Sequence, residues 1–215
     1  MMDLHTHTVF SDGIGDVLEN VAVAEDRVSL LGISDHLHYL SWTNVNHYLR
    51  EIARAKEESE ITVLAGVEAN IMETGTDITD AIAERLDYVI ASVHMWFEPG
   101  DAWKYLELVK LALRDRNVDV IGHFGNVFPY IGYPSWEELL EVIEVAEEEG
   151  KAFEISSRYK VPDLEFVREC VKRGVKLTLG SDAHRPQDVG RIGWSERMFR
   201  LAGGKKEDLL FSEFL

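Results

Sequence analysis

The chain has 215 residues, of which 46% are hydrophobic and 10% aromatic, and this is enough apolar material for one substantial core. Its formal net charge of -17 argues against a broad surface for long nucleic acids, which recruit basic residues, but not against a small anionic substrate. The sequence shows neither a signal peptide nor an apolar run near the ~20 residues of a membrane span, so we expect a cytoplasmic protein without a membrane segment.

Short apolar segments rich in β-branched residues alternate along the chain with segments of helical periodicity. Strands are expected at 2–8, 30–36, 61–70, 87–94, 118–124, 151–156 and 175–184. Helices are expected at about 15–31, 45–59, 77–86, 102–117, 135–150, 163–173 and 188–202. This alternation predicts serial βα units with a parallel sheet, and so many repeats without a linker favour closure into one barrel domain spanning residues 1–215.

The helix in "SWEELLEVIEVAEEEG" has the clearest boundaries. Ser135 with Glu138 three residues later forms a capping-box pattern, and Gly150 is a typical helix stop. The only cysteine, Cys170, excludes an intramolecular disulfide. It lies in the amphipathic pattern "EFVRECVKRG", so we expect a buried structural thiol there.

The first predicted strand, "DLHTHT", carries two histidines that can face the same end of a barrel, because alternate residues of a strand point the same way. Five other strands also end in residues of the types that bind metal ions, while the sixth, ending near Glu154, is ambiguous. In a parallel barrel all carboxyl ends of the strands lie on one face, where barrel enzymes place their chemistry. The candidate metal ligands at this face are His5, His7, Asp12, His36, Glu68, His94, His123, Asp182 and His184.

Each of these residues has a simpler explanation when taken alone. A lone strand histidine is more often a satisfied core or surface residue, and Asp12, in an "SDG" turn, could only cap the following helix. Together, so many ionisable groups in one cleft would repel one another and lose solvation unless bound cations balanced them. Three protein ligands for each ion give three sites, and imidazole with carboxylate but no thiolate suits zinc, manganese or iron.

The ordered segments "DLHTHTVFSDG", "GISDH", "GVEAN", "ASVH", "GHF" and "LGSDAH" resemble the motifs of the polymerase and histidinol phosphatase (PHP) family, over residues 3 to 188. The resemblance implies a distorted (β/α)7 barrel with a trinuclear metal site that hydrolyses phosphoesters. Carried over position by position, it implies His5, His7, Glu68 and Asp182 for the first ion, Glu68, His94 and His123 for the second, and Asp12, His36 and His184 for the third. Some relatives have histidine where Asp12 stands, and aspartate is also a common variant there.

Three divalent ions would bring six positive charges against the carboxylates of Asp12, Glu68 and Asp182, which creates a local anion trap in an acidic protein. We therefore expect a phosphomonoesterase in which a metal-bound hydroxide attacks phosphorus, with Glu68, His94 and Asp182 as the catalytic residues. Arg158 and Arg185 are the candidate phosphate-binding residues, ahead of Lys160 and Arg191. The expected substrate is a small phosphate ester, and histidinol phosphate is one candidate.

Three alternatives stay open at this point. A related phosphoesterase could act on nucleotides or oligonucleotide ends. Metal-dependent amidohydrolases also place His-x-His on the first strand of a barrel, but many of them have a bridging modified lysine where this chain has Glu68 and His94. A non-catalytic accessory module fits less well, because no expected ligand is missing.

Two residues near His36 are not expected to bind metal directly. Asp35 is expected to point away from His36 as a structural group, and His38 could reach the cleft.

Overall fold

The computed structural model describes residues 1–40 and 42–215. Within these residues, parallel strands form one sheet in the order β1 (Met2–Asp3), β2 (Leu30–Ile33), β3 (Thr62–Met72), β5 (Tyr88–Ser92), β6 (Val120–Ile121), β7 (Ala152–Ser156) and β8 (Lys176–Gly180). The chain just after β1 meets β8 and the segment that follows it, because the Leu4 amide donates to the Leu179 carbonyl at 2.9 Å and the His7 amide to that of Ala183 at 2.8 Å. The sheet is therefore a nearly closed seven-stranded α/β barrel, as expected.

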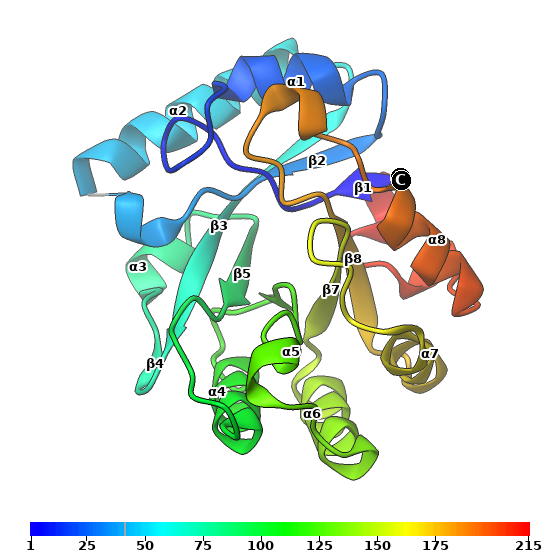
Figure 1. Ribbon diagram of the computed structural model, residues 1–215. Coiled ribbons are helices and arrows are strands. Elements are labelled where there is room, and N and C mark those ends of the chain that lie inside the picture. Colours follow the sequence, from blue (N-terminus) through cyan, green and yellow to red (C-terminus); the bar gives the residue numbers. More distant parts are fainter. Residues whose placement is uncertain (41) are drawn as a thin grey trace.

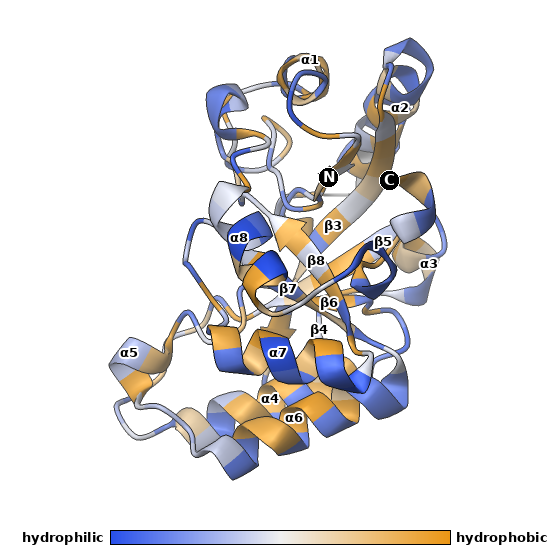
Figure 2. Ribbon diagram, turned by 90° about the vertical axis from the view of Figure 1, so that its right-hand side faces the viewer, coloured by the Kyte–Doolittle hydropathy of each residue, from blue (hydrophilic) through white to orange (hydrophobic). Residues whose placement is uncertain are grey.

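The helices lie around the outside of the strands (Figure 1). Their bounds are α1 (Val17–Ala24), α2 (Trp42–Glu58), α3 (Asp80–Ala83), α4 (Ala102–Leu113), α5 (Phe128–Ile131), α6 (Trp136–Glu149), α7 (Leu164–Arg173) and α8 (Gly193–Leu201). Short 3-10 turns form η1 (Leu37–Tyr39), η2 (Pro186–Asp188), η3 (Lys206–Asp208) and η4 (Ser212–Phe214). Figure 2 shows hydrophobic and hydrophilic residues alternating around α6 and α7, which matches helices with one buried face.

Several predicted bounds were wrong in ways that matter for the site. The first strand was expected at 2–8, but its regular backbone pairing ends at Asp3. Beyond that point side chains replace part of the backbone pairing, as where the Thr6 amide donates to Ser34 Oγ at 3.1 Å. The third strand was expected at 61–70, and β3 continues to Met72 because it forms an antiparallel hairpin with β4 (Gly75–Thr76). The helix expected at 15–31 ends at Ala24, and the one at 77–86 is a single turn, α3.

Tyr88 fills the barrel interior below the mouth. It is fully buried, and its hydroxyl donates to the Leu4 carbonyl at 2.6 Å. A Cβ at Gly32 would lie 2.0 Å from the Tyr88 hydroxyl oxygen, and one at Gly66 would lie 2.4 Å from Tyr88 Cζ. At these two positions, on β2 and β3, only glycine therefore leaves room for the Tyr88 ring. No helix of the described residues is long and apolar enough to cross a lipid bilayer.

Candidate metal centre

Glu68 is the centre of the cluster at the mouth of the barrel. It projects from the middle of β3 and is only 1% exposed. Its Oε1 lies 3.4 Å from His5 Nε2, 3.3 Å from His94 Nε2 and 3.1 Å from His123 Nε2. Its Oε2 lies 2.8 Å from His36 Nδ1. One buried carboxylate therefore contacts imidazoles that follow four different strands of the sheet.

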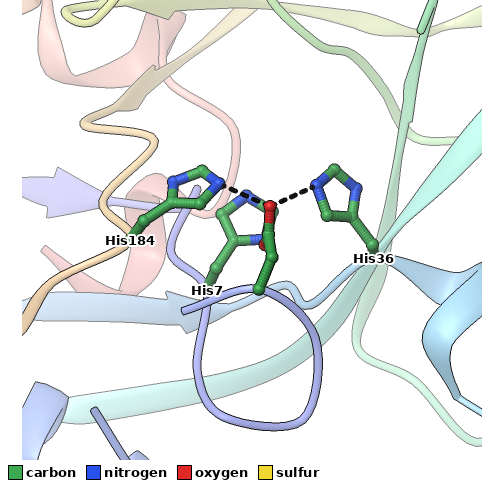
Figure 3. A group of neighbouring side chains, drawn as sticks. His7, His36 and His184 are labelled. Carbon is green, nitrogen blue, oxygen red and sulfur yellow. Dashed lines mark hydrogen bonds and ion pairs between the residues drawn. The ribbon is translucent and has the colours of Figure 1, made fainter. Parts of the chain in front are cut away.

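The remaining candidate ligands gather around two further carboxylates. Asp182 Oδ1 lies 3.3 Å from His7 Nε2. Asp12 Oδ2 lies 3.1 Å from His184 Nε2 and 3.6 Å from His36 Nε2. Figure 3 shows His7, His36 and His184 converging, with dashed lines from His36 and His184 to the carboxylate. The turn that carries Asp12 thus folds back over the rim, and the structure brings all nine predicted ligands together.

Ligand atoms within 4.8 Å of one another form three groups in the described residues: His7 with Asp12, His36 and His184; His5 with His7 and Asp182; and His36 with Glu68 and His94. These groups do not reproduce the expected division into three ion sites, since His123 belongs to none of them and His36 also joins the Glu68 group. His123 nevertheless lies at the cluster, because its Nε2 is 3.1 Å from Glu68 Oε1.

Two of the candidate ligands have an unusual backbone conformation. His123 has φ 28° and Asp182 has φ 51°, and both are non-glycine residues in the left-handed region. Such conformations are unfavourable for side chains with a Cβ and concentrate at functional sites. Here they turn the chain just after β6 and β8, so that both side chains aim at the mouth rather than continue the strand alternation.

The buried carboxylate of Asp35 supports the segment that carries the candidate ligand Asp12. Asp35 accepts hydrogen bonds from the Thr8 amide at 2.8 Å, the Thr8 hydroxyl at 2.8 Å and the Ser11 hydroxyl at 2.6 Å. Asp35 thereby pins the turn that carries Asp12, in agreement with its expected structural role. His38 lies beside the cluster, because its ring centroid is 5.4 Å from that of His36 and its Nδ1 lies 3.1 Å from the Asn70 amide nitrogen.

Two further residues support the cluster: Glu154, whose strand end was ambiguous from the sequence, and Asn70, which was not predicted. The buried Glu154 carboxylate accepts from the His123 amide at 2.7 Å, and its Oε2 lies 3.1 Å from His5 Nδ1. Asn70 Oδ1 lies 2.9 Å from His94 Nδ1. Both signals were present in the sequence: Glu154 is a charged residue inside an apolar strand, and Asn70 follows Glu68 by two residues on the same strand.

The electrostatics of the cluster are those of anions that require nearby positive charge. Burial alone would raise the pKa of Glu68, but the charge of His5 and hydrogen bonds from His123 and His36 hold that pKa well below its usual range. Burial alone would lower the pKa of His5, but the carboxylates of Glu154 and Glu68 raise it well above its usual value. Burial likewise opposes ionisation of Asp182, yet the charge of His5 and contact with His7 lower the pKa of Asp182.

The residues fit bound divalent cations. Both ring nitrogens of His5 and of His7 are buried and make no well-aligned hydrogen bond, although carboxylate oxygens lie as near as 3.1 Å to His5 Nδ1 and 3.3 Å to His7 Nε2. Orphaned buried polar atoms are rare because each loses its interaction with water. Imidazole nitrogen and carboxylate oxygen are suitable donors for zinc, manganese or iron. Metal ions among these groups would supply both the missing partners and the positive charge.

A cavity of about 560 Å³ opens beside the cluster. It is lined by the candidate ligands Asp12, Asp182 and His184 and by both predicted phosphate-binding residues, Arg158 and Arg185. Arg158 is 44% exposed, and its Nη1 donates to the Asp182 carbonyl at 3.0 Å. Arg191 lines the same cavity, whereas Lys160 lines a separate one between α5 and α7.

Comparison with known proteins places this geometry in a family. The model described as PHP domain matches residues 3–158. A "probable phosphatase" of Acetivibrio thermocellus is 30% identical over 215 residues, which covers 94% of this chain and 85% of that protein. A "probable phosphatase" of Caldanaerobacter subterraneus is 32% identical over 213 residues, covering 92% of this chain and 82% of the relative.

Among solved structures, a "putative histidinol phosphatase" from Listeria monocytogenes superimposes with a TM-score of 0.74. The likeness covers 91% of this chain and 99% of that one, at 16% identity. At so low an identity the likeness shows that the two proteins share the barrel fold, and it carries no substrate with it.

Proposed function

Because the chain belongs to the PHP domain family, we propose that it is a metal-dependent phosphatase that hydrolyses a small-molecule phosphate monoester. The observation that carries the proposal is the convergence of buried imidazoles and carboxylates on Glu68, with ring nitrogens of His5 and His7 that make no well-aligned hydrogen bond. An acidic protein with such a cluster gains a local positive centre when cations bind, and a positive centre attracts phosphate.

We assign three divalent ions, of zinc, manganese or iron, to this cluster. His5, His7, Glu68 and Asp182 would hold the first, Glu68, His94 and His123 the second, and Asp12, His36 and His184 the third. When bound, such ions lower the pKa of water and neutralise charge on phosphate oxygens. The contacts of Glu68 Oε1 with three imidazoles support its role as the bridging ligand.

In the net reaction a water oxygen forms a bond to phosphorus while the bond from phosphorus to the ester oxygen breaks, and the alcohol leaves with one proton from water. Glu68, His94 and Asp182 are the residues that we propose to orient the reacting groups. Arg158 would donate to the non-bridging oxygens of a phosphate in the cavity, since a planar guanidinium matches phosphate in a bidentate way. These fixed charges oppose the charge that develops in the transition state.

The test is a phosphatase assay on protein purified without chelator and analysed for metals. The panel includes histidinol phosphate, nucleotides, sugar phosphates and an amide substrate. We expect metal-dependent release of phosphate, and we expect Glu68→Ala or His94→Ala to lower turnover at least about a thousandfold.

Glu73→Ala is the matched control, because Glu73 is an exposed carboxylate just beyond β3 that pairs with Lys104 at 2.8 Å. Its turnover should equal that of the unaltered protein. Undiminished turnover in Glu68→Ala, or a metal-loaded protein that cleaves the amide but none of the esters, would contradict the proposal.

A further inference from the structure

The cavity beside the candidate metal centre is lined by equal numbers of arginines and carboxylates, but the carboxylates are engaged with other groups. Three arginines line it, Arg158, Arg185 and Arg191, against the carboxylates of Asp12, Asp182 and Asp188. Asp12 and Asp182 face the imidazole cluster, so their charge is directed to the metal centre. Asp188 neutralises Arg191, because Asp188 Oδ1 lies 2.8 Å from Arg191 Nη1.

Arg185 is the guanidinium that remains. In the part of the chain that the structure describes, no carboxylate lies within ion-pair distance of Arg185, whereas Arg158 lies 3.6 Å from Asp182 Oδ1. Arg185 directly follows the candidate ligand His184, so it stands at the edge of the metal centre. An exposed arginine without an acidic partner, in a cavity of a chain with net charge -17, is available to an anion from solution.

The backbone under Arg185 is held in place from several sides. Arg185 precedes Pro186 and has the extended backbone that a following proline demands, φ -137° and ψ 139°. Its carbonyl accepts from the Asp188 amide at 2.9 Å, and the carbonyl of His184 accepts from the Ile14 amide at 2.9 Å.

Two more contacts hold the segment after Arg185 against residues on either side of α1. A Cβ at Gly15 would lie 2.3 Å from Pro186 Cγ, so the two backbones approach closely there. Arg27 Nη1 donates to the carbonyls of Gln187 at 2.8 Å and Val189 at 2.6 Å. The backbone beside Arg185 is thus held in place, so that ligand binding has to order the arginine side chain but not the chain that carries it.

We propose that Arg185 binds a second anionic group on the alcohol part of the substrate, a carboxylate or a further phosphate. This inference rests on the proposed phosphatase function, with the reacting phosphate at the metal centre and Arg158. The preferred substrates are then phosphate esters whose alcohol part carries an acidic group. Esters whose alcohol part is cationic, such as histidinol phosphate with its amino group, are disfavoured, because the cavity presents a like charge to them.

Binding of stable phosphonates to the metal-loaded protein tests the proposal without turnover. Propylphosphonate has a neutral tail, and 3-phosphonopropionate carries a carboxylate on a tail of the same kind. Calorimetric titration should show about tenfold tighter binding of 3-phosphonopropionate. Propane-1,3-bisphosphonate is the third probe: tighter binding than 3-phosphonopropionate assigns the subsite to phosphate, and weaker binding assigns it to carboxylate.

Two variants locate the effect. Arg185→Gln should reduce the preference for 3-phosphonopropionate to within about twofold, and Arg185→Lys should keep most of it because the charge remains. Arg50→Gln makes the same change in net charge on exposed surface of α2, away from the cavity, and should leave the preference intact.

Equal affinity for the neutral and acidic probes, an equal loss of preference in Arg50→Gln, or no binding of either phosphonate would overturn the inference. If the protein hydrolyses esters but shows no such preference, the proposed role of Arg185 is wrong and the phosphatase function stands. A preference abolished by Arg185→Gln in a protein that hydrolyses no ester would keep the subsite and remove the phosphatase function.

Discussion

At the scale of single residues, the candidate ligands are oriented by hydrogen bonds on the side away from the cluster. The Asn70 side-chain amide donates to Asp77 Oδ2 at 2.7 Å, so its oxygen must face His94 Nδ1, 2.9 Å away. An acceptor there requires Nδ1 of His94 to carry the proton. Nε2 of His94 then presents its lone pair toward Glu68, as a metal ligand must.

Asn70→Ala should therefore weaken metal binding without removing a ligand. Loss of such a supporting contact typically lowers metal affinity about 10- to 100-fold. Competition with a chromophoric chelator measures this change directly. Asn46→Ala is the control, since Asn46 is an exposed residue of α2 that accepts from Arg85 at 2.7 Å. Unchanged metal affinity in Asn70→Ala would show that His94 is oriented by other contacts.

At the scale of elements, two helices with similar N-cap residues differ in the contact that the cap makes. At the start of α6 the Ser135 hydroxyl accepts from the Glu138 amide at 3.2 Å, and Glu138 Oε2 accepts from the Ser135 amide at 2.7 Å. At the start of α3, Thr79 makes no side-chain cap hydrogen bond. The capping pattern that the sequence predicted for α6 is thus confirmed, and it accounts for a helix that runs the full Trp136–Glu149.

Ser135→Ala should lower the free energy of unfolding by about 1 kcal/mol, which is the usual contribution of an N-cap hydroxyl. Thr79→Ala should change it by a few tenths of that amount at most, because no cap bond is lost. Urea unfolding followed by circular dichroism gives both values under one set of conditions. Equal losses in the two variants would mean that cap geometry does not determine the stability of these helices.

At the scale of the whole molecule, the candidate metal centre lies over the seam where the barrel closes. His5 and His7 follow β1, Asp182 follows β8, and His7 Nε2 lies 3.3 Å from Asp182 Oδ1 across this seam. One backbone bond across the seam is long, from the Ala183 amide to the His5 carbonyl at 3.4 Å, whereas the His7 amide reaches the Ala183 carbonyl at 2.8 Å. Ions shared by groups on both sides would join the first and last strands, so metal binding should also stabilise the fold.

Removal of metal by a chelator should therefore lower the melting temperature. One ion present at a hundred times its dissociation constant contributes about 2.7 kcal/mol, which corresponds to roughly 5–10 °C in a protein of this size. Scanning calorimetry before chelation, after it and after readdition of zinc or manganese measures the effect. Glu68→Gln should respond much less to the chelator. A melting temperature that stays the same after verified metal removal would contradict this prediction.

Much of the fold and of the site was readable from local pattern. The alternation of apolar and helical segments predicted the parallel barrel, because both patterns report local burial. The position of each candidate ligand near the carboxyl end of a strand predicted its convergence with the others, because parallel strands share that end. The single cysteine, Cys170, is buried as expected.

The supporting contacts could not be read in the same way, because they join positions whose separation along the chain has no period. The contact of Glu154 with His5 crosses the barrel interior, and the extension of β3 that carries Asn70 depends on its hairpin with β4. The charge balance of Arg185 also depends on which carboxylates lie nearby.

The sequence by itself determined the order of the elements, the ligand types and the end of the barrel where they meet, because strand periodicity and donor chemistry are local properties. Only the tertiary structure decided which acceptor holds each imidazole, how the Asp12 turn folds over the rim, and which arginine is left unpaired beside it. Those are distances between groups far apart in the chain, and they exist only once the barrel has closed.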